Sequence, residues 1–493
     1  MSKILPKPLK DEYNTRLDKL KKIREQKINP YPEKFEKLQS VAEVLKLKVG
    51  KKVKTAGRLL TIREMGKIAF CHIQDSSSKM QIVLKKNDLD LKKFLKIFDP
   101  ADFIGIEGEV FKTKKGELSI LVKKYTLLSK ALRPLPEKFH GLKDQESIYR
   151  QRYLDLTSNQ ETFDRFLFRS QFIKSLREFY WAQNFIEVET PILTNTASGA
   201  LAKPFNTRHN ALDIDVFLRI APETYLKESI VGGFERVFEI GRAFRNEGMD
   251  PSHLQDFTIA EHYTAYWNFE DNMKFTEQMF EYLLKKLLGT LKVEIMDRQG
   301  KLHKVDFKPP WPKVSFAKVI KKDCGIDIDK IKSVDELRKQ ITKKKIKIDD
   351  INKLERGNLI DALYKTVSQD KIIQPTFLTS HPIDVSPLAR RNDDNPDIVD
   401  RFQLVVNGWE IVNAYSELID PVDQAQRFFH QVRAKRKGDS EAHGKDDEYV
   451  KALEHGAPPM SGWGMGIDRI ITLLTKQDNL RDVVLFPLLR PEK

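Results

Sequence analysis

The chain has 493 residues, of which 86 are Lys or Arg and 71 are Asp or Glu, so its formal net charge is +15. The two cysteines lie far apart and form no CxxC pair, which excludes a disulfide framework and a cysteine-based zinc site. No apolar signal core stands at the N-terminus, and no run approaches the ~18 apolar residues of a membrane span. We therefore expect a soluble, cytoplasmic protein with about three domains or subdomains, whose basic excess favours a polyanionic partner.

The first predicted elements are a charged helix and a set of short strands. Residues 11–26 have Leu17, Leu20 and Ile23 at helical spacing, and the run Asn29-Pro30 ends that helix. From about residue 52 to 128 the pattern changes to five β runs, with a helical piece at 90–98 between the third and the fourth. The runs are 53–60, 68–74, 80–84, 103–111 and 117–121. This pattern predicts an all-β barrel, in the layout of an OB-fold that binds oligonucleotides.

A linker separates this barrel from the rest of the chain. Residues 132–145 contain two prolines and a glycine without periodicity, so we predict one domain over 1–142 and a second over 143–493. Residues 162–182 are predicted to form a helix with one aromatic and aliphatic face. That face comprises Phe163, Phe166, Ile173, Leu176 and Tyr180. Residues 287–371 are lysine-rich and are predicted to be a mostly helical insertion in the second domain.

Residues 236–263 are the most informative stretch of the second domain. Two strand-like runs, 237–240 and 257–259, flank a polar loop, with Arg245 and Glu247 at its root and His253 near its far end. Such a hairpin can present a guanidinium, an imidazole and carboxylates to one polyanionic ligand, and a planar guanidinium suits phosphate. On this stretch alone, a surface hairpin whose charges are merely solvated is the alternative.

Residues 462–475 read GWGMGIDRIITLLT, a glycine-spaced run that leads into an apolar helix. Glycines allow a backbone to approach a flat ligand closely, and Arg469 lies near a helix start, where phosphate is favoured. A tight packing turn between a strand and a helix would give the same spacing.

These two segments, together with FIEVETPIL at 185–193, resemble motifs 2, 3 and 1 of the class II aminoacyl-tRNA synthetases. Over essentially its full length, the chain is similar to the class II lysyl-tRNA synthetases of the class IIb group. The matching segments are RQRYLDL at 150–156, RIAPE at 219–223, PLARRND at 387–393, NAYSELIDP at 413–421 and GIDR at 466–469.

The resemblance implies an α+β protein with an N-terminal, five-stranded OB-fold barrel for the anticodon. Its catalytic domain would be built on an antiparallel β-sheet flanked by helices. The implied activity is that of a lysine–tRNA ligase, which activates L-lysine with ATP to lysyl-adenylate and pyrophosphate and transfers lysine to the 3′ end of tRNA(Lys). The resemblance also implies a homodimer, in which motif 1 pairs across a two-fold axis.

Lysine carries an ammonium group at each end, so its site needs carboxylates at both ends and one cation between them. By resemblance, Glu223 and the backbone of Gly199 take the α-amino group. Glu417 and Tyr263 take the ε-ammonium group, and Glu261 supports them. A pocket for aspartate or asparagine would need a cation or an amide at the distal end instead.

The carboxylate of lysine would be held by Asn413 and Arg245, again by resemblance. Of the residues expected to be catalytic, Arg245 would clamp the α-phosphate of ATP, Arg469 the γ-phosphate, and Glu410 would bind Mg²⁺ through hard oxygen. Positioning and cations would supply most of the catalysis. The expected ATP contacts are those of Arg245, Glu247, His253, Phe257, Glu410, Gly466 and Arg469.

Two positions depart from the family pattern. Many members carry a second acidic metal ligand seven residues before Glu410, where this chain has Gln403. An amide oxygen can still bind Mg²⁺ but brings no charge, so the number of metal ions stays open. In the loop of motif 2, Leu254 replaces a polar residue near the expected adenine position.

The expected anticodon readers are Phe70, Gln81 and Glu117, also by resemblance. An aromatic ring can stack on an unstacked base, while an amide and a carboxylate can read base edges. The alternative for Phe70 is a place in the core of the barrel.

Two other functions compete with this interpretation. A synthetase-derived ligase that modifies a protein would lack the barrel, whereas residues 52–128 are present here. A catalytically dead paralogue would lack Arg245, Arg469 or Glu410, and all three are present.

Overall fold

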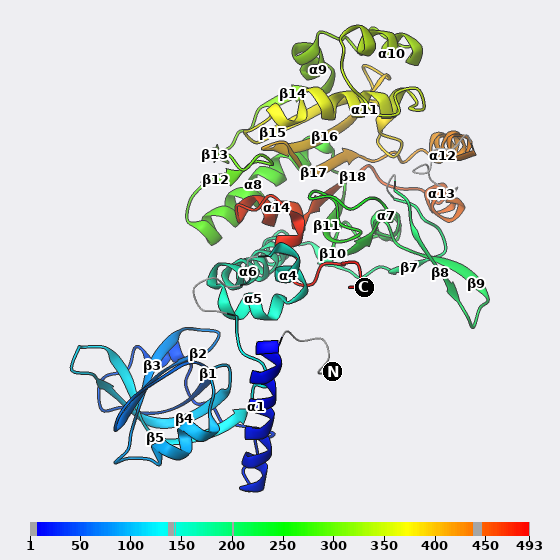
Figure 1. The fold of residues 1–493 in the computed structure, drawn as a ribbon. Helices are drawn as coiled ribbons and strands as arrows, with labels where there is room; N and C mark the ends of the chain where they lie inside the picture. The colour runs from blue at the N-terminus through cyan, green and yellow to red at the C-terminus, as the bar shows by residue number, and fades with distance from the viewer. Residues whose placement is uncertain (1–6, 137–141, 143, 200–201, 437–445, 493) are drawn as a thin grey trace. The chain divides into compact units, whose positions relative to one another are not determined.

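The computed structural model describes residues 7–136, 142, 144–199, 202–436 and 446–492 (Figure 1). Contacts divide the chain into two units, Met1–Asn159 and Gln160–Lys493. The short helices α4 (Gln145–Arg150) and α5 (Arg152–Ser158) are thus counted with the first unit, although they follow the boundary predicted near residue 142. No helix within the described ranges is long and apolar enough to cross a membrane.

The first unit contains a closed barrel with the strand order β1-β2-β3-β5-β4. Its strands are β1 (Lys52–Met65), β2 (Ile68–Gln74), β3 (Lys79–Lys85), β4 (Phe103–Lys112) and β5 (Leu118–Ser129). Helix α3 (Leu91–Ile97) lies between β3 and β4 in the sequence, and the Asp90 side chain caps it by accepting from the Lys93 amide. The predicted five-stranded barrel with one interposed helix is therefore confirmed, with β1 and β5 longer than predicted.

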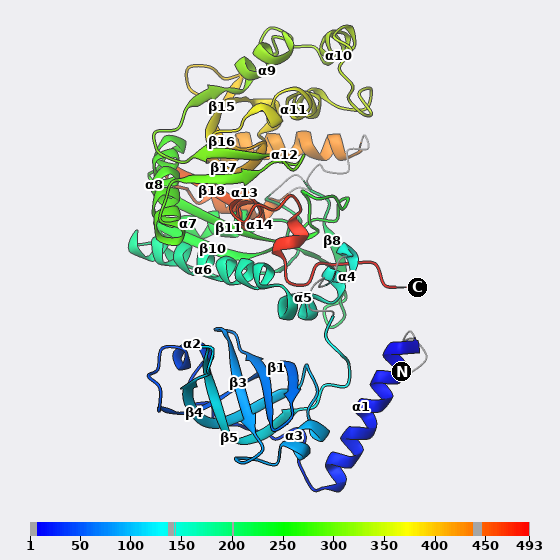
Figure 2. The same ribbon diagram turned by 60° about the vertical axis from the view of Figure 1, so that its left-hand side comes forward.

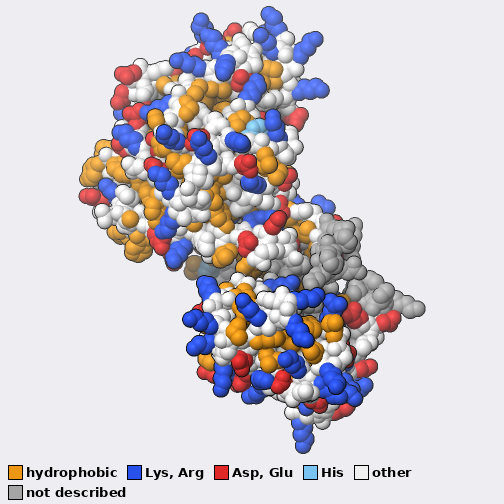
Figure 3. All heavy atoms as spheres, turned by 90° about the vertical axis from the view of Figure 1, so that its left-hand side faces the viewer, with side chains coloured by type: hydrophobic (Ala, Val, Ile, Leu, Met, Phe, Trp, Pro, Cys, Tyr) orange, Lys and Arg blue, Asp and Glu red, His pale blue; other side chains and the backbone are white. Residues whose placement is uncertain are grey.

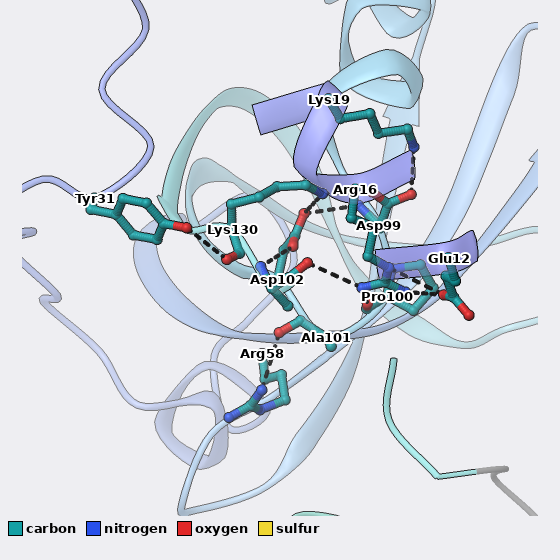
Figure 4. A network of polar contacts seen from close by, with 11 residues as sticks. Glu12, Arg16, Lys19, Tyr31, Arg58, Asp99, Pro100, Ala101, Asp102 and Lys130 are labelled. Carbon is teal, nitrogen blue, oxygen red and sulfur yellow. Dashed lines mark hydrogen bonds and ion pairs between the residues drawn. The ribbon is translucent and has the colours of Figure 1, made fainter. Parts of the chain in front are cut away.

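The N-terminal helix α1 (Lys7–Glu25) is held on the barrel by a buried network of charges (Figure 4). Arg16 donates to two backbone carbonyls of the barrel unit, and Lys19 pairs with Asp99 at 2.5 Å. The ammonium of Lys130, which is fully buried, lies 2.6 Å from Asp99 and 2.8 Å from Asp102. Since an unpaired buried charge is costly, this network fixes the helix and the end of β5 together. The short helix α2 (Val41–Val44) packs on β1 and β3.

The second unit is built on an eight-stranded sheet, which is antiparallel except for the parallel pairs β14–β15 and β10–β6. In sheet order its strands are β14 (Lys313–Ser315), β15 (Thr376–Pro382), β16 (Ile398–Val406), β17 (Trp409–Ser416), β18 (Met460–Gly466), β11 (Asp256–Ala265), β10 (Arg236–Phe244) and β6 (Ile186–Glu187). The predicted α+β class and antiparallel catalytic sheet are confirmed.

Helices α6 (Gln160–Ala182), α8 (Phe269–Leu288) and α14 (Ile467–Leu474) share one apolar core with this sheet (Figure 2). An Asn268–Asp271 capping box starts α8, and Gly289 ends it in the left-handed region at φ +69°. The buried stripe of α6 differs from the predicted one. Phe163, Phe166 and Ile173 are only half-buried, because the core takes Phe172 and Phe179 with the expected Leu176 and Tyr180.

Residues 287–371 are less helical than predicted. They begin with a hairpin, β12 (Lys292–Met296) and β13 (Leu302–Asp306), followed by the sheet-edge strand β14. Helices α9 (Phe316–Cys324), α10 (Val334–Lys343) and α11 (Arg356–Val367) come after these and form an apolar cluster of their own.

The other elements surround the sheet. They are β7 (Leu193–Thr194), β8 (Phe205–His209), β9 (Ile214–Leu218), α7 (Glu223–Val231), α12 (Pro421–Arg436), α13 (Asp447–Glu454) and the 3₁₀ turns η2 (Gln369–Lys371), η3 (Ile383–Val385) and η4 (Leu480–Val483).

Candidate functional site

A cavity of about 310 Å³ lies on the central strands of the eight-stranded sheet. Strand alternation creates its floor. On β11, Phe257, Ile259, Glu261 and Tyr263 line the cavity, whereas Ala260 between them belongs to the core shared with the helices. Because side chains alternate across a strand, one face of the sheet packs helices and the other holds the site.

Glycines of β18 give the cavity its depth. Gly462, Gly464 and Gly466 all line it. A Cβ atom placed on Gly462 would lie 2.3 Å from Glu417 Oε1 and 2.3 Å from Tyr263 Cε1. A side chain there is sterically excluded, so the glycine spacing serves close approach to the cavity and not only strand-to-helix packing.

One region of the cavity is cationic. Arg245 and Arg469 both line it. Arg469 donates to the Glu410 carbonyl at 3.0 Å, and the Arg245 guanidinium stacks on Phe257 with its carbon 5.1 Å from the ring centre. Burial lowers the pKa of Arg245, Glu247 opposes that shift, and Arg469 adds to it. An anion placed between the two guanidinium groups would relieve their repulsion.

Another region is acidic, and helix α7 supplies part of it. Glu223 and Lys227 lie one helical turn apart on the same face, with Lys227 Nζ 2.5 Å from Glu223 Oε1. Glu223 Oε1 also accepts a hydrogen bond from the Tyr415 hydroxyl at 2.7 Å. Gly199, at φ +94°, packs against Glu223 so closely that a Cβ atom would lie 3.2 Å from the Glu223 Cβ.

Glu417 completes the acidic region from behind the cavity wall. Its side chain is fully buried, and Oε2 lies 2.5 Å from Lys227 Nζ. Apart from this ion pair, Glu417 has no hydrogen-bond partner among the described residues, so its Oε1 is unpartnered, and the same holds for Glu261 Oε2. Its Oε1 lies directly behind Gly462, a lining residue that has no side chain. Such under-satisfied carboxylate oxygens are suited to a cationic ligand.

Asn413 lies between the acidic and cationic groups on β17. Its side-chain oxygen accepts from Arg401 Nε at 2.8 Å, so its NH₂ group keeps its donors for a ligand. Arg401 also lines the cavity.

Arg401 and Lys227 were not predicted from the sequence. The i,i+4 spacing of Glu223 and Lys227 was the only sign of Lys227, and such pairs are common on helix surfaces.

The loop between β10 and β11 forms the outer edge of the cavity. Glu247, His253 and Leu254 line it, and His253 Nδ1 lies 2.8 Å from Asp250 Oδ2. All of the expected nucleotide contacts, including Gly466, therefore border one cavity.

The two expected metal ligands do not lie together at the cavity. Glu410 lines it, whereas Gln403 is buried and outside its lining, with Oε1 3.2 Å from His381 Nε2. Burial and the nearby Arg401 lower the pKa of His381 well below its usual value, so this imidazole stays neutral. No group of three or more His, Cys, Asp or Glu side chains in the described part of the chain could hold a metal ion. A cation at Glu410 would therefore need further oxygen atoms from a bound ligand.

The expected anticodon residues form a second surface, on the outside of the barrel. Phe70 is half-exposed on β2, where its neighbours Ala69 and Cys71 face the core instead. Gln81 donates to Glu117 at 2.9 Å, and His72, paired with Gln81 across the strands, lies 4.0 Å from Glu117. His72 was not predicted, although its i+2 spacing from Phe70 puts it on the same face.

Comparison with known proteins gives consistent matches for both units. The family of tRNA synthetases class II (D, K and N) matches residues 144–490, and the OB-fold nucleic acid binding domain matches residues 53–128. The chain is 45% identical to the lysine–tRNA ligase of Fervidobacterium nodosum over 98% of this chain and 95% of that protein. It is 47% identical to the lysine–tRNA ligase of Aquifex aeolicus over 90% of this chain and 73% of that protein. It is 44% identical to the lysine–tRNA ligase of Carboxydothermus hydrogenoformans over 98% of this chain and 99% of that protein.

From the acidic region we predict how the free energy of unfolding changes with pH in the parent relative to Glu261→Gln. Burial and the nearby Glu223 raise the pKa of Glu261 from 4.5 to about 8, with Arg245 opposing the rise. Because the pKa of Glu261 is higher in the folded state than in the unfolded state, the protonated side chain stabilises the folded protein. This contribution to the free energy of unfolding is complete below the unfolded-state pKa and is lost as pH rises through the folded-state pKa. Relative to the variant, the free energy of unfolding of the parent should therefore fall by up to about 1.4 kcal/mol per pH unit between about pH 5 and 8.

Tryptophan fluorescence measures this directly, because all five tryptophans lie after residue 159 and report on the second unit. The exposed Glu270→Gln variant is the control. Unfolding energies of parent and Glu261→Gln that stay parallel across this pH range would contradict the prediction.

Proposed function

The chain belongs to the class II tRNA synthetases (D, K and N), among the lysine–tRNA ligases, and we propose that its cavity activates L-lysine with ATP for transfer to the 3′ end of tRNA(Lys). The observation that carries the substrate is the buried carboxylate of Glu417. Its Oε2 is paired with Lys227, whereas its Oε1 lacks a hydrogen-bond partner among the described residues and lies next to Gly462, which lines the cavity. A buried, under-satisfied carboxylate at the far end of an amino-acid pocket selects a distal ammonium group.

The lysine molecule is then held by charge at three points. Glu223, with the backbone of Gly199, takes the α-ammonium group. Glu417 and Tyr263 take the ε-ammonium group, supported by Glu261. The amide NH₂ of Asn413 and the guanidinium of Arg245 take the carboxylate.

Activation is the attack of the lysine carboxylate oxygen on the α-phosphorus of ATP. A carboxyl–phosphoryl bond forms as the bond to the pyrophosphate oxygen breaks, and pyrophosphate leaves. The carboxylate is already ionised, so no general base is needed. Negative charge grows on the phosphoryl oxygens, and Arg245 at the α-phosphate and Arg469 at the γ-phosphate stabilise it in place.

The nucleotide would lie between the loop and β11, with Phe257 stacking under adenine and Glu247 and His253 contacting it. Glu410 would hold Mg²⁺, which supplies positive charge to the phosphates when it is bound with ATP. Gln403 could contribute only if its amide left His381, so Glu410 is the ligand that we propose.

Transfer follows when a hydroxyl of the terminal ribose of tRNA attacks the lysyl carbonyl and AMP leaves. Since the reaction serves translation, we place it in the cytoplasm. The rival functions fit less well, because the barrel is present and Arg245, Arg469 and Glu410 all border the cavity.

Lysine-dependent ATP–pyrophosphate exchange tests this function. The parent should exchange with lysine and far less with aspartate or asparagine, whose distal groups carry no positive charge. Glu417→Gln should reduce kcat/KM for lysine by roughly 1–3 kcal/mol or more, because it leaves a desolvated ammonium group poorly paired. The exposed Glu454→Gln variant is the matched control. Equal exchange with aspartate would refute lysine activation, and an unchanged kcat/KM would remove Glu417 from the pocket.

We propose that the barrel reads the anticodon on the face that carries Phe70, Gln81 and Glu117. Phe70 is available for stacking, because the barrel core is filled by its inward neighbours. In Figure 3, many Lys and Arg side chains lie on the visible face of the barrel unit, interspersed with Asp and Glu, and basic side chains suit a nucleic-acid partner. The proposed domain division is a reading domain over 1–142 and a catalytic domain over 143–493.

Phe70→Ala and Gln81→Ala should raise the KM for tRNA without affecting adenylation. Stacking on one base is worth about 1–3 kcal/mol, so charging efficiency should fall on the order of 10- to 100-fold. Exchange should stay within a factor of about two, because every described residue that lines the cavity belongs to the second unit. Leu38→Ala, an exposed apolar residue of the same unit, is the control. A Phe70→Ala protein that charges tRNA normally would refute the role of this face.

We also propose a homodimer that uses the segment around β6 and β7. Large apolar side chains are exposed along it, which is unusual for a free surface. They are Trp181, Ile186, Ile192 and Leu193. Because residues 185–193 resemble motif 1, the partner that we propose is a second copy of the chain.

Sedimentation should give twice the chain mass of 57.3 kDa for the parent. Trp181→Glu should shift the protein toward monomer, since it places a charge in an apolar interface. Leu302→Glu, a similarly exposed position on β13, should stay dimeric. A parent that is monomeric at all concentrations and fully active would refute the proposal.

A further inference from the structure

We propose that Lys227 is a positioning residue for amino-acid recognition, whose buried ammonium group bridges Glu223 and Glu417 and leaves one oxygen of each for the substrate. This inference rests on the proposed lysine activation and deepens it. Lys227 does not line the cavity. It therefore acts through the two carboxylates and not by touching the substrate.

In each of the two carboxylates, one oxygen contacts Lys227 and the other does not. Lys227 Nζ lies 2.5 Å from Glu223 Oε1 and 2.5 Å from Glu417 Oε2. The Tyr415 hydroxyl donates to the same Glu223 oxygen. Glu417 Oε1 is left without a hydrogen-bond partner in the described structure and points to Gly462 at the cavity wall. One fixed cation thus sets the orientation of both carboxylates, which come from α7 and from the segment after β17.

The surroundings hold the ammonium group in place. The Lys227 side chain is fully buried, with its nitrogen 5.5–5.8 Å from the ring centres of Tyr263, Tyr415 and Tyr449. These rings come from β11, β17 and α13. Together with α7, which carries Lys227, four elements therefore surround one ammonium group. An ordinary surface i,i+4 pair has no such enclosure. Cation–π contacts with the rings add to the ion pairs.

The charges explain what the bridge does. The titratable groups that face Lys227 are Glu223, Glu417 and the three tyrosines, with Glu261 close by. Burial alone would lower the pKa of Lys227, but Glu223 and Glu417 outweigh it and raise that pKa above its usual range. Burial raises the pKa of Glu417, and Lys227 opposes this rise. Without the bridge, Glu417 would take up a proton more readily and lose its attraction for the distal ammonium group of the substrate.

The test is Lys227→Met in lysine-dependent ATP–pyrophosphate exchange, with the exposed Lys285→Met variant as the matched control. We expect kcat/KM for lysine to fall about 100-fold or more, because one partner of a buried charge pair has been removed. The loss should lie mainly in the KM for lysine, with the KM for ATP little changed. The logarithm of kcat/KM should also continue to rise to higher pH than in the parent, because Glu417 loses the cation that lowers its pKa and ionises only at higher pH.

A double variant separates positioning from folding. If Lys227 acts through Glu417, the loss in Lys227→Met/Glu417→Gln should be smaller than the product of the two single losses. Multiplied losses would overturn the proposal, as would an unaltered lysine KM or a pH profile parallel to that of the parent. If Lys227→Met does not fold, Lys227→Arg keeps the charge but alters the bridge. Its lysine KM should then rise with a pH profile like the parent's, and an unchanged KM would overturn the proposal. A parent without lysine-dependent exchange would refute the proposed function instead.

Discussion

The second unit contains a buried ammonium group, that of Lys227, which must be paired with acidic side chains. Lys227 is fully buried, and moving an ammonium group from water into a protein costs several kcal/mol unless good partners receive it. Glu223 and Glu417 are those partners, and they come from segments about 190 residues apart. The ion pairs therefore join α7 to the segment that follows β17. The same requirement that stabilises this interior fixes the carboxylates of the proposed substrate site.

A second constraint is the period of the β-strand. Alternate residues of β11 face opposite sides, so His262 is buried among the helices while Glu261 and Tyr263 face the cavity. Burial lowers the pKa of His262 to about 3, and Tyr180 and Asn272 hydrogen-bond its two ring nitrogens. This neutral, fully bonded histidine ties α6 and α8 to the strand. The strand that lines the cavity is thus packed against helices on its opposite face.

Much of the fold followed from the sequence, because strand alternation and turn residues act locally. The barrel strands, their interposed helix and the β10–β11 hairpin were predicted in their correct places. The role of Gly462 was not decidable, since its tight contacts are with Glu417 and Tyr263, which are distant in sequence. Lys227 was missed for a similar reason. Its spacing from Glu223 indicates an ordinary helix pair, and only packing from three further elements makes the pair buried. The Gln403–His381 contact likewise depends on the register of β15 with β16.

The arrangement of charged side chains also determines the orientation in which an amino acid can bind in the cavity. Carboxylates gather around Glu417 and guanidinium groups around the proposed phosphate positions, with Asn413 between them on β17. An amino acid with an ammonium group at its far end fits in only one orientation, because reversal would place its carboxylate among buried acids. That orientation presents the carboxylate to Arg245, where the α-phosphate is proposed to lie. Aspartate in the same position would bury its distal carboxylate beside Glu417, and burying a charge without a partner is costly. Selection of the substrate and alignment of its reacting oxygen therefore follow from the same set of charges.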